Sequence, residues 1–184
     1  MGSLRSLAQA LDAPERTVRR AAMEGLIHGE RVSPRRFRTS LREEAYLRRH
    51  WPVLRALREA LRTEPNVRLA VLFGSLATGT ATERSDIDIL AVLADSHVGR
   101  VVDVADRLAR RLNRDVQLVR LEDAERSPVL MAAVLDQGRV LVDRDGLWPN
   151  LARRAGQWKR RAREMEVPLE QAMEELDVAD PAVR

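Results

Sequence analysis

Two short apolar runs stand out in the middle of the chain. The first covers residues 67–73 (VRLAVLF) and ends at Gly74-Ser75, and the second covers residues 87–93 (IDILAVL) and follows directly on Asp86. Both are rich in Val, Ile and Leu and are bounded by Gly, Thr, Ser or Asp. Such runs predict buried strands.

The pattern after the second run alternates between helix and strand. Apolar residues at helical spacing predict helices over residues 97–112 and 122–136, with the first capped by Asp95-Ser96. Shorter apolar runs predict strands at 114–121 and 139–142. Strands that alternate with helices indicate the α/β class, with a small mixed sheet.

The first third of the chain shows only helical spacing. Apolar residues predict a helix over residues 4–11 and a second helix over residues 15–24, which Pro14 opens and Gly25 ends. We therefore expect an all-α helix-turn-helix unit, to which the following basic segment adds a wing or an arm. A long helix follows over residues 41–62, and we expect Pro52 to kink or split it.

These elements predict four consecutive parts and a basic start to the chain. Residues 1–63 hold 14 Arg against seven acidic residues, whereas the whole chain carries a net charge of +4. This imbalance indicates that the N-terminal part meets a polyanion. The predicted parts are a helix-turn-helix domain at 1–40, a linker helix at 41–63, an α/β domain at 64–146 and C-terminal helices at 147–184.

The composition limits the kinds of chemistry and the cell compartments that we expect for the protein. The chain has no Cys, which excludes disulfides and thiolate chemistry and agrees with a reducing cytoplasm. Its apolar runs are all shorter than the eighteen residues that a membrane-spanning helix needs. We expect a cytoplasmic protein that does not enter a membrane.

Asp86 and Asp88 are the first candidates for chemistry. They lie two positions apart at the start of a predicted strand, so both side chains point to one face, about 6–7 Å apart. Two carboxylates so close repel each other unless a cation lies between them. Hard oxygen ligands suit Mg²⁺ or Mn²⁺. The alternative is an N-capping aspartate next to a surface acid.

Gly74 and Ser75 are the second pair of candidates. Glycine at a strand end lets the backbone approach a ligand, and the Ser75 hydroxyl with the N–H groups after it could hold a phosphate. A phosphate site opposite a carboxylate pair suits nucleoside triphosphate chemistry.

The spacing of these two pairs resembles that of the minimal nucleotidyltransferases of the DNA polymerase β superfamily. The resemblance rests on Gly74-Ser75, ten intervening residues, and Asp86-x-Asp88, each in the expected strand context. It implies Mg²⁺ held by the two aspartates and an NTP, most often ATP, bound at Gly74-Ser75. Proteins of this kind often act as antitoxins that add AMP to a partner toxin protein. RNA or a small molecule is the other kind of acceptor.

A third carboxylate, which the family takes from a later strand, is replaced in this sequence. The matching position in residues 114–121 is Gln117, which can ligate a metal through its carbonyl oxygen but cannot take a proton. Asp115 is expected to point to the opposite face and could substitute only if the strand slips or bulges. Gln117 is therefore a candidate for weakened catalysis, or simply a polar residue on a strand.

The helix-turn-helix adds a second class of function. A basic helix in the major groove would use Arg16, Thr17, Arg19 and Arg20, while Arg35 and Arg36 in the next segment would contact the DNA backbone. The alternative is a solvated Arg-rich helix. Since such proteins usually bind as dimers, we expect a homodimer on double-stranded DNA. The sequence thus predicts either an antitoxin-like nucleotidyltransferase with a DNA-binding domain, or a regulator whose nucleotidyltransferase domain serves as sensor or docking module.

Overall fold

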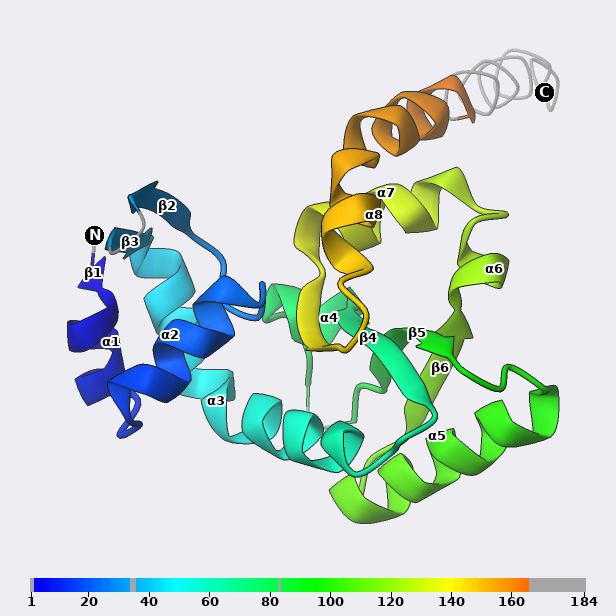
Figure 1. Ribbon diagram of the computed structural model, residues 1–184, viewed down its shortest axis with the longest axis horizontal. Helices are drawn as coiled ribbons and strands as arrows, with labels where there is room; N and C mark the ends of the chain where they lie inside the picture. The colour runs from blue at the N-terminus through cyan, green and yellow to red at the C-terminus, as the bar shows by residue number, and fades with distance from the viewer. Residues whose placement is uncertain (1, 34–35, 83, 166–184) are drawn as a thin grey trace, which may run out of the picture.

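The N-terminal part contains two short helices and a small sheet. The computed structural model describes residues 2–33, 36–82 and 84–165 (Figure 1). Strand β1 (Gly2–Ser3) leads into α1 (Leu4–Ala10) and α2 (Glu15–Met23), and the hairpin β2 (Glu30–Ser33) and β3 (Arg36–Thr39) follows. The sheet is antiparallel in the order β1-β3-β2. The two helices agree with the prediction, and the hairpin β2–β3 lies in the basic segment for which a wing or an arm was expected. Strand β1 was not predicted, because two residues are too few to show a strand pattern.

Helix α3 (Leu41–Arg62) joins this part to the rest of the chain. Ser40 caps its first turn by accepting a hydrogen bond from the Glu43 N–H at 3.0 Å. The helix continues through Pro52, so the expected split does not occur; Pro52 is solvent-exposed, and its neighbour Trp51 is buried. Its buried face includes the apolar residues Tyr46, Leu47, Trp51, Leu54, Leu57, Ala60 and Leu61.

A four-stranded mixed sheet forms the body of the molecule. Its strands are β4 (Val67–Phe73), β5 (Ile87–Leu93), β6 (Val116–Arg120) and β7 (Arg139–Asp143). They lie in the order β6-β5-β4-β7, with β5 and β6 parallel and the other two pairs antiparallel. The predicted α/β class and the mixed sheet are confirmed.

Helices cover both faces of this sheet. Helices α1, α2, α3 and α5 (Val98–Leu112) share one apolar core with one face. On the other face lie α6 (Leu121–Ala124), α7 (Pro128–Gln137), α8 (Trp148–Arg153) and a further helical segment over 155–165. Figure 1 shows α3 running from the N-terminal part along the sheet, and the last helical segment pointing away from it.

Two predicted helices differ from those in the structure. The helix expected over 122–136 is two helices, α6 and α7, because Pro128 opens a new helix that Ser127 caps. The cap of α5 is His97, whose ring accepts a hydrogen bond from the Gly99 N–H, and not Asp95-Ser96. Of the C-terminal helices expected over 147–184, the part from residue 166 onward lies outside the described residues.

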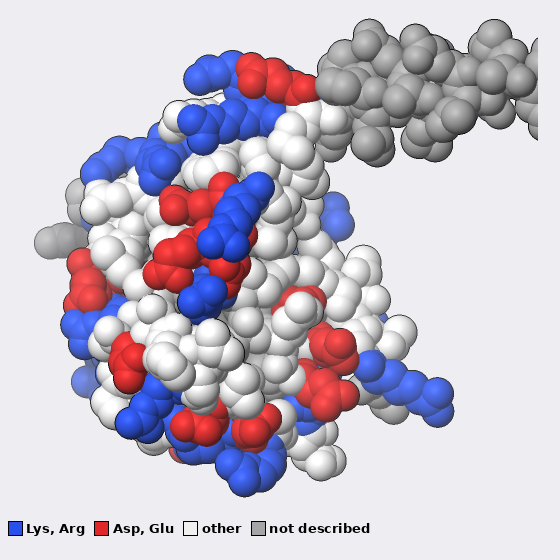
Figure 2. Space-filling view, turned by 90° about the vertical axis from the view of Figure 1, so that its right-hand side faces the viewer, with Lys and Arg blue, Asp and Glu red and all other residues white. Residues whose placement is uncertain are grey.

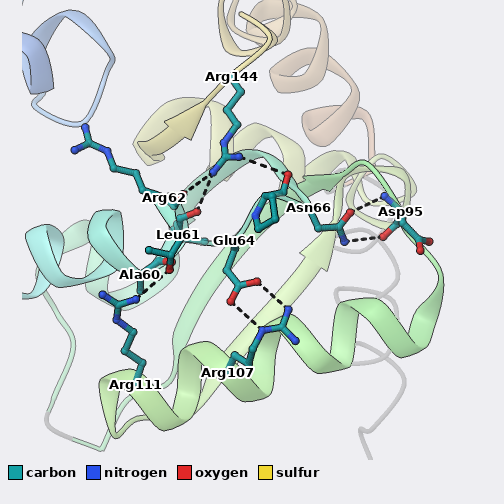
Figure 3. Close-up of polar contacts among 11 residues, drawn as sticks. Ala60, Leu61, Arg62, Glu64, Asn66, Asp95, Arg107, Arg111 and Arg144 are labelled. Atoms are coloured by element: carbon teal, nitrogen blue, oxygen red, sulfur yellow. Dashed lines mark hydrogen bonds and ion pairs between the residues drawn. The ribbon is translucent and has the colours of Figure 1, made fainter.

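Polar contacts fasten the turn between α3 and β4, at the far end of the sheet from Gly74. Arg107 on α5 donates two hydrogen bonds to Glu64 at 2.9 and 2.8 Å, and Asn66 exchanges two with the Asp95 backbone at 2.9 and 2.7 Å (Figure 3). Arg144 after β7 donates to the carbonyls at the end of α3. These contacts fix where α3 ends against the sheet.

A buried ion pair joins the N-terminal part to the sheet. Arg139 on β7 is 4% exposed and donates to both carboxylate oxygens of Glu43 on α3, which is 6% exposed, at 2.6 and 2.9 Å. The same guanidinium donates to the carbonyls of Leu26 and Ala77 and lies 3.6 Å from the centre of the Tyr46 ring. Glu43 also accepts the His28 N–H at 2.9 Å. The Arg139 guanidinium therefore contacts three other segments of the chain: α3, α4 and the residues that follow α2.

Within the described ranges, no helix is long and apolar enough to cross a membrane.

Breaking this ion pair should be costly. Glu43→Gln keeps the shape of the side chain but leaves the Arg139 charge buried without its counter-ion, so we expect a loss of about 3 kcal/mol in the free energy of unfolding. Urea denaturation measures it. The matched control is Glu59→Gln on the same helix, where an exposed carboxylate lies 3.7 Å from Arg111, and there we expect less than about 0.5 kcal/mol. Equal losses in the two variants would contradict this assignment.

Candidate active site

The two aspartates lie at the start of β5, beside the end of β4. Asp88 is the second residue of β5 and pairs with Phe73, the last residue of β4. Asp88 is half-buried, whereas Asp86, just before the strand, is exposed. Asp88 therefore lies beside the turn that leads from β4 into α4 (Gly74–Thr78), and Asp86 precedes Asp88 by two positions.

Gly74 brings this turn directly against Asp88. Its φ is +70°, a backbone conformation that residues with a side chain rarely adopt. A Cβ added at Gly74 would lie 3.1 Å from the Asp88 Cγ and would collide with the carboxylate oxygen of Asp88. Ser75 follows as the second residue of α4, and the first turn of α4 has no side-chain cap. Gly74 and Asp88, one residue from each predicted pair, thus lie against each other.

Gln117 occupies the place expected of the third acid. The parallel pairing of β5 with β6 sets Gln117 opposite Asp88, and in-register residues of parallel strands point to the same face. Gln117 is exposed. An amide thus lies beside the aspartate pair, where the resemblance implied a carboxylate.

Asp115 lies on a different side of the chain from the one expected. It precedes β6 and lies two positions before Gln117, so alternation places the two on the same side of the chain, and the expectation of opposite faces was wrong. Its carbonyl accepts a hydrogen bond from the Ile87 N–H at 2.9 Å, which continues the ladder without a bulge. Among the described residues, no group of three or more His, Cys, Asp or Glu side chains could hold a metal ion, so an ion at this site would have Asp86 and Asp88 as its carboxylate ligands.

The electrostatics of the pair favour a bound cation. Partial burial, and next to it the charge of Asp86, raise the pKa of Asp88 above its ordinary value. A divalent cation would relieve both effects, because it offsets the repulsion and stabilises the ionised form. Two carboxylates and no sulfur or imidazole fit Mg²⁺ or Mn²⁺.

Hydrogen bonds from α3 and β7 fix the C-terminal half of α4. Tyr46 donates its hydroxyl to the Leu76 carbonyl at 3.0 Å, and Arg139 donates to the Ala77 carbonyl at 2.9 Å. Burial raises the pKa of Tyr46 to about 12, so its hydroxyl stays protonated and able to donate. Gly79, which ends α4 at φ +84°, approaches the Tyr46 ring closely. Local sequence patterns do not reveal this supporting role of Tyr46, because the carbonyl that accepts its hydroxyl lies 30 residues away in the chain.

The predicted basic surface is present on α2. Arg16, Thr17 and Arg20 are exposed. Arg19 forms an ion pair with Glu15 at 2.6 Å and Arg20 one with Glu24 at 2.7 Å, both within the same stretch of chain. Arg36 on β3 is exposed, and Arg35 lies outside the described residues.

The part of the chain that resembles known proteins contains the end of α3 and the four-stranded sheet. The sequence profile described as "Polymerase beta, Nucleotidyltransferase" matches residues 55–146. Protein adenylyltransferase MntA of Shewanella oneidensis is 38% identical over 91 residues, which are 48% of this chain and 61% of that protein. The chain therefore spans less than two thirds of this relative.

Solved structures agree with this likeness. A chain from a crystal structure of a toxin–antitoxin with AMP-PNP superposes with a TM-score of 0.53 at 30% identity, over 65% of this chain and 98% of that chain. A chain from the toxin–antitoxin complex MntA-HepT gives a TM-score of 0.50 at 27% identity, over 67% and 98%.

The contact between Gly74 and Asp88 can be tested by substitution. Gly74→Ala should destabilise the protein by about 1 kcal/mol more than Gly146→Ala, because both glycines have positive φ but only the first would strike a neighbour. Gly146 has no atom within 4 Å of an added Cβ and is the matched control.

The extra cost should vanish in an Asp88→Ala background, and urea unfolding of the four variants closes this cycle. If the cost of Gly74→Ala were the same with and without the Asp88 side chain, the proposed contact would be wrong.

Proposed function

Because the chain belongs to the polymerase β nucleotidyltransferase family, we propose that it transfers a nucleoside monophosphate from an NTP, ATP most often, to a hydroxyl group of a partner protein. The observation that carries this proposal is the approach of Gly74 to Asp88, which combines a phosphate-binding turn with a metal-binding carboxylate pair. The raised pKa of Asp88 also supports a bound cation, whereas Gln117 stands where a carboxylate was expected.

In this proposal each part of the site has one task. The backbone at Gly74 and the Ser75 hydroxyl hold the triphosphate, and Asp86 and Asp88 hold Mg²⁺ or Mn²⁺. The metal, when bound, supplies positive charge that stabilises the phosphate oxygens. Residue 74 must be a glycine because a side chain there would clash with Asp88 and would occupy the space proposed for the phosphates.

The transfer itself is an in-line displacement. The acceptor oxygen attacks the α-phosphorus and forms a new P–O bond, while the bond to the oxygen that bridges to the β-phosphate breaks. Pyrophosphate leaves with that electron pair. The acceptor proton passes to water, because the Gln117 amide can orient a hydroxyl but cannot accept its proton.

A protein acceptor is favoured by the relatives. MntA is named a protein adenylyltransferase, and both solved structures described above are of toxin–antitoxin assemblies. We propose by analogy that this chain acts as an antitoxin that modifies a toxin-like partner. RNA and small molecules remain the alternative acceptors.

Label transfer tests the function and the effect of Gln117. Purified protein with α-labelled ATP, Mg²⁺ and lysate of its own host should label an acceptor, and Asp86→Asn/Asp88→Asn should remove the label. Gln117→Asp restores a group that takes a proton and should raise the rate about tenfold or more. Gln9→Asp, at an exposed position of α1, is the control and should leave the rate unchanged. An unchanged rate in Gln117→Asp would show that Gln117 does not limit the chemistry.

We propose DNA binding as a second function of the N-terminal part. Exposed Arg16, Thr17 and Arg20 on α2, the β2–β3 hairpin nearby and the basic balance of residues 1–63 support it. Together they form a helix-turn-helix with a short wing, which suits the major groove and the flanking backbone. A homodimer on two half-sites fits this use. If Gln117 abolishes transfer, the protein would act as a regulator with a sensing or docking domain.

DNA binding has its own test. Arg16→Ala/Arg20→Ala should weaken binding to the protein's own promoter fragment at least tenfold and lower the salt dependence by about one unit per lost phosphate contact. Arg160→Ala/Arg163→Ala removes the same charge from the last helical segment and should change neither. A gel-shift titration at several salt concentrations measures both. Equal losses in the two variants would reduce the effect to overall charge.

A further inference from the structure

Strand β6 leaves one edge of the sheet open beside the candidate active site. It is last in the strand order and pairs only with β5 among the described strands. The Ile87 N–H bonds to the carbonyl of Asp115, so by alternation the backbone groups of Val116 and Leu118 face away from β5. Such unpaired groups are a template for another extended chain.

An apolar groove runs beside this edge. Val98 and Val102 on α5 are 64% and 51% exposed, unusually high for valine, and with Leu118 they line a cavity of about 280 Å³. The side of the molecule that carries α5 and α6 shows uncharged surface bordered by acidic and basic side chains (Figure 2). The Arg120–Asp123 ion pair also lines the groove, and through Leu118 the groove offers apolar contacts on the face of β6 opposite to Gln117.

The open edge also leads directly to the aspartate pair. Gln117 lies in register with Asp88 on the neighbouring strand. Strands in a sheet lie about 4.8 Å apart, so a strand added to β6 would run about 9–10 Å from the backbone of Asp88. A hydroxyl side chain on that strand, opposite Gln117, would point across the amide toward the two aspartates.

We propose that the open edge of β6 is the docking site for an extended segment of the protein that accepts the nucleotide, which joins the sheet as a fifth strand and presents a hydroxyl residue opposite Gln117. The inference rests on the proposed function, since it assigns that site its acceptor. It goes beyond it by naming the surface that binds the acceptor and the form in which the acceptor binds.

Alternation along the added strand specifies the segment. The residue opposite Gln117 points to the active site, and those opposite Leu118 and Arg120 point to the groove and should be apolar. Asp115 and Glu122 lie just beyond the two ends of β6, are exposed, and form no ion pair in the part of the chain that the structure describes. Basic residues at both ends of the segment would complement them.

A second copy of this chain is the less suitable occupant. Strand β6 (VQLVR) carries no hydroxyl side chain, so two copies paired through β6 would place no acceptor opposite Gln117. A hydroxyl residue within an apolar, basic-ended segment of another protein meets all three features of the surface: the unpaired backbone, the groove and the terminal carboxylates.

Peptide binding tests the proposal without depending on catalysis. The probe is a fluorescein-labelled peptide, Arg-Val-Gln-Val-Tyr-Val-Gln-Val-Lys, mixed with the full chain, Mg²⁺ and a non-hydrolysable ATP analogue, and followed by anisotropy. Two control peptides of the same sequence carry N-methyl groups on alternate backbone amides, one in each phase. We expect the unmodified peptide to bind and one of the methylated peptides to bind at least tenfold more weakly, because methylation blocks the edge that meets β6.

Protein variants locate the site. Val102→Glu should weaken peptide binding at least tenfold, whereas Val129→Glu, on the exposed face of α7 and 44% exposed, should bind as the wild type does. No peptide binding, or equal binding of methylated peptides and of both variants, would overturn the proposal. Self-association that Val102→Glu abolishes, without an effect of peptide, would overturn it in favour of a second copy. Peptide binding without transfer of label from ATP would retain the docking site and refute the proposed transfer.

Discussion

The buried pair of Arg139 and Glu43 is the contact on which the arrangement of the site depends. Arg139 comes from β7 and reaches α3 through Glu43, the N-terminal part through the Leu26 carbonyl and α4 through the Ala77 carbonyl. A buried ion pair is no proof of stability, since two apolar side chains can fill such a space as well. What this pair supplies is position: it holds the back of α4 while the front of α4, at Gly74, meets Asp88.

The site combines features that cost stability. Gly74 adopts a positive φ, Asp88 is partly buried, and Asp86 adds a like charge beside it. These costs are borne by the strands and helices around the site, with β4 and β5 almost wholly buried and α4 fixed at its far end by Tyr46. Conflicts of this kind are common where structure serves chemistry.

How much the sequence predicts depends on the distance over which each feature is determined. The bounds of α3, β4 and β5 follow from local periodicity and are confirmed. The register of Gln117 with Asp88 depends on the pairing of β5 with β6, which local periodicity does not determine. Arg139 appears in sequence as an ordinary basic residue, because its partner Glu43 lies 96 positions away. The three-stranded sheet was missed because β1 has two residues, too few for any pattern.

The most direct measurement is a crystal structure of the full chain with Mg²⁺ and a non-hydrolysable ATP analogue. We predict a metal ion between the carboxylates of Asp86 and Asp88, phosphates against the backbone of Gly74 and the Ser75 hydroxyl, and the α-phosphate open toward Gln117 and the edge of β6. A nucleotide bound elsewhere, for example in the cavity lined by Tyr46, His50 and Arg139, with no metal at the aspartates, would contradict this prediction.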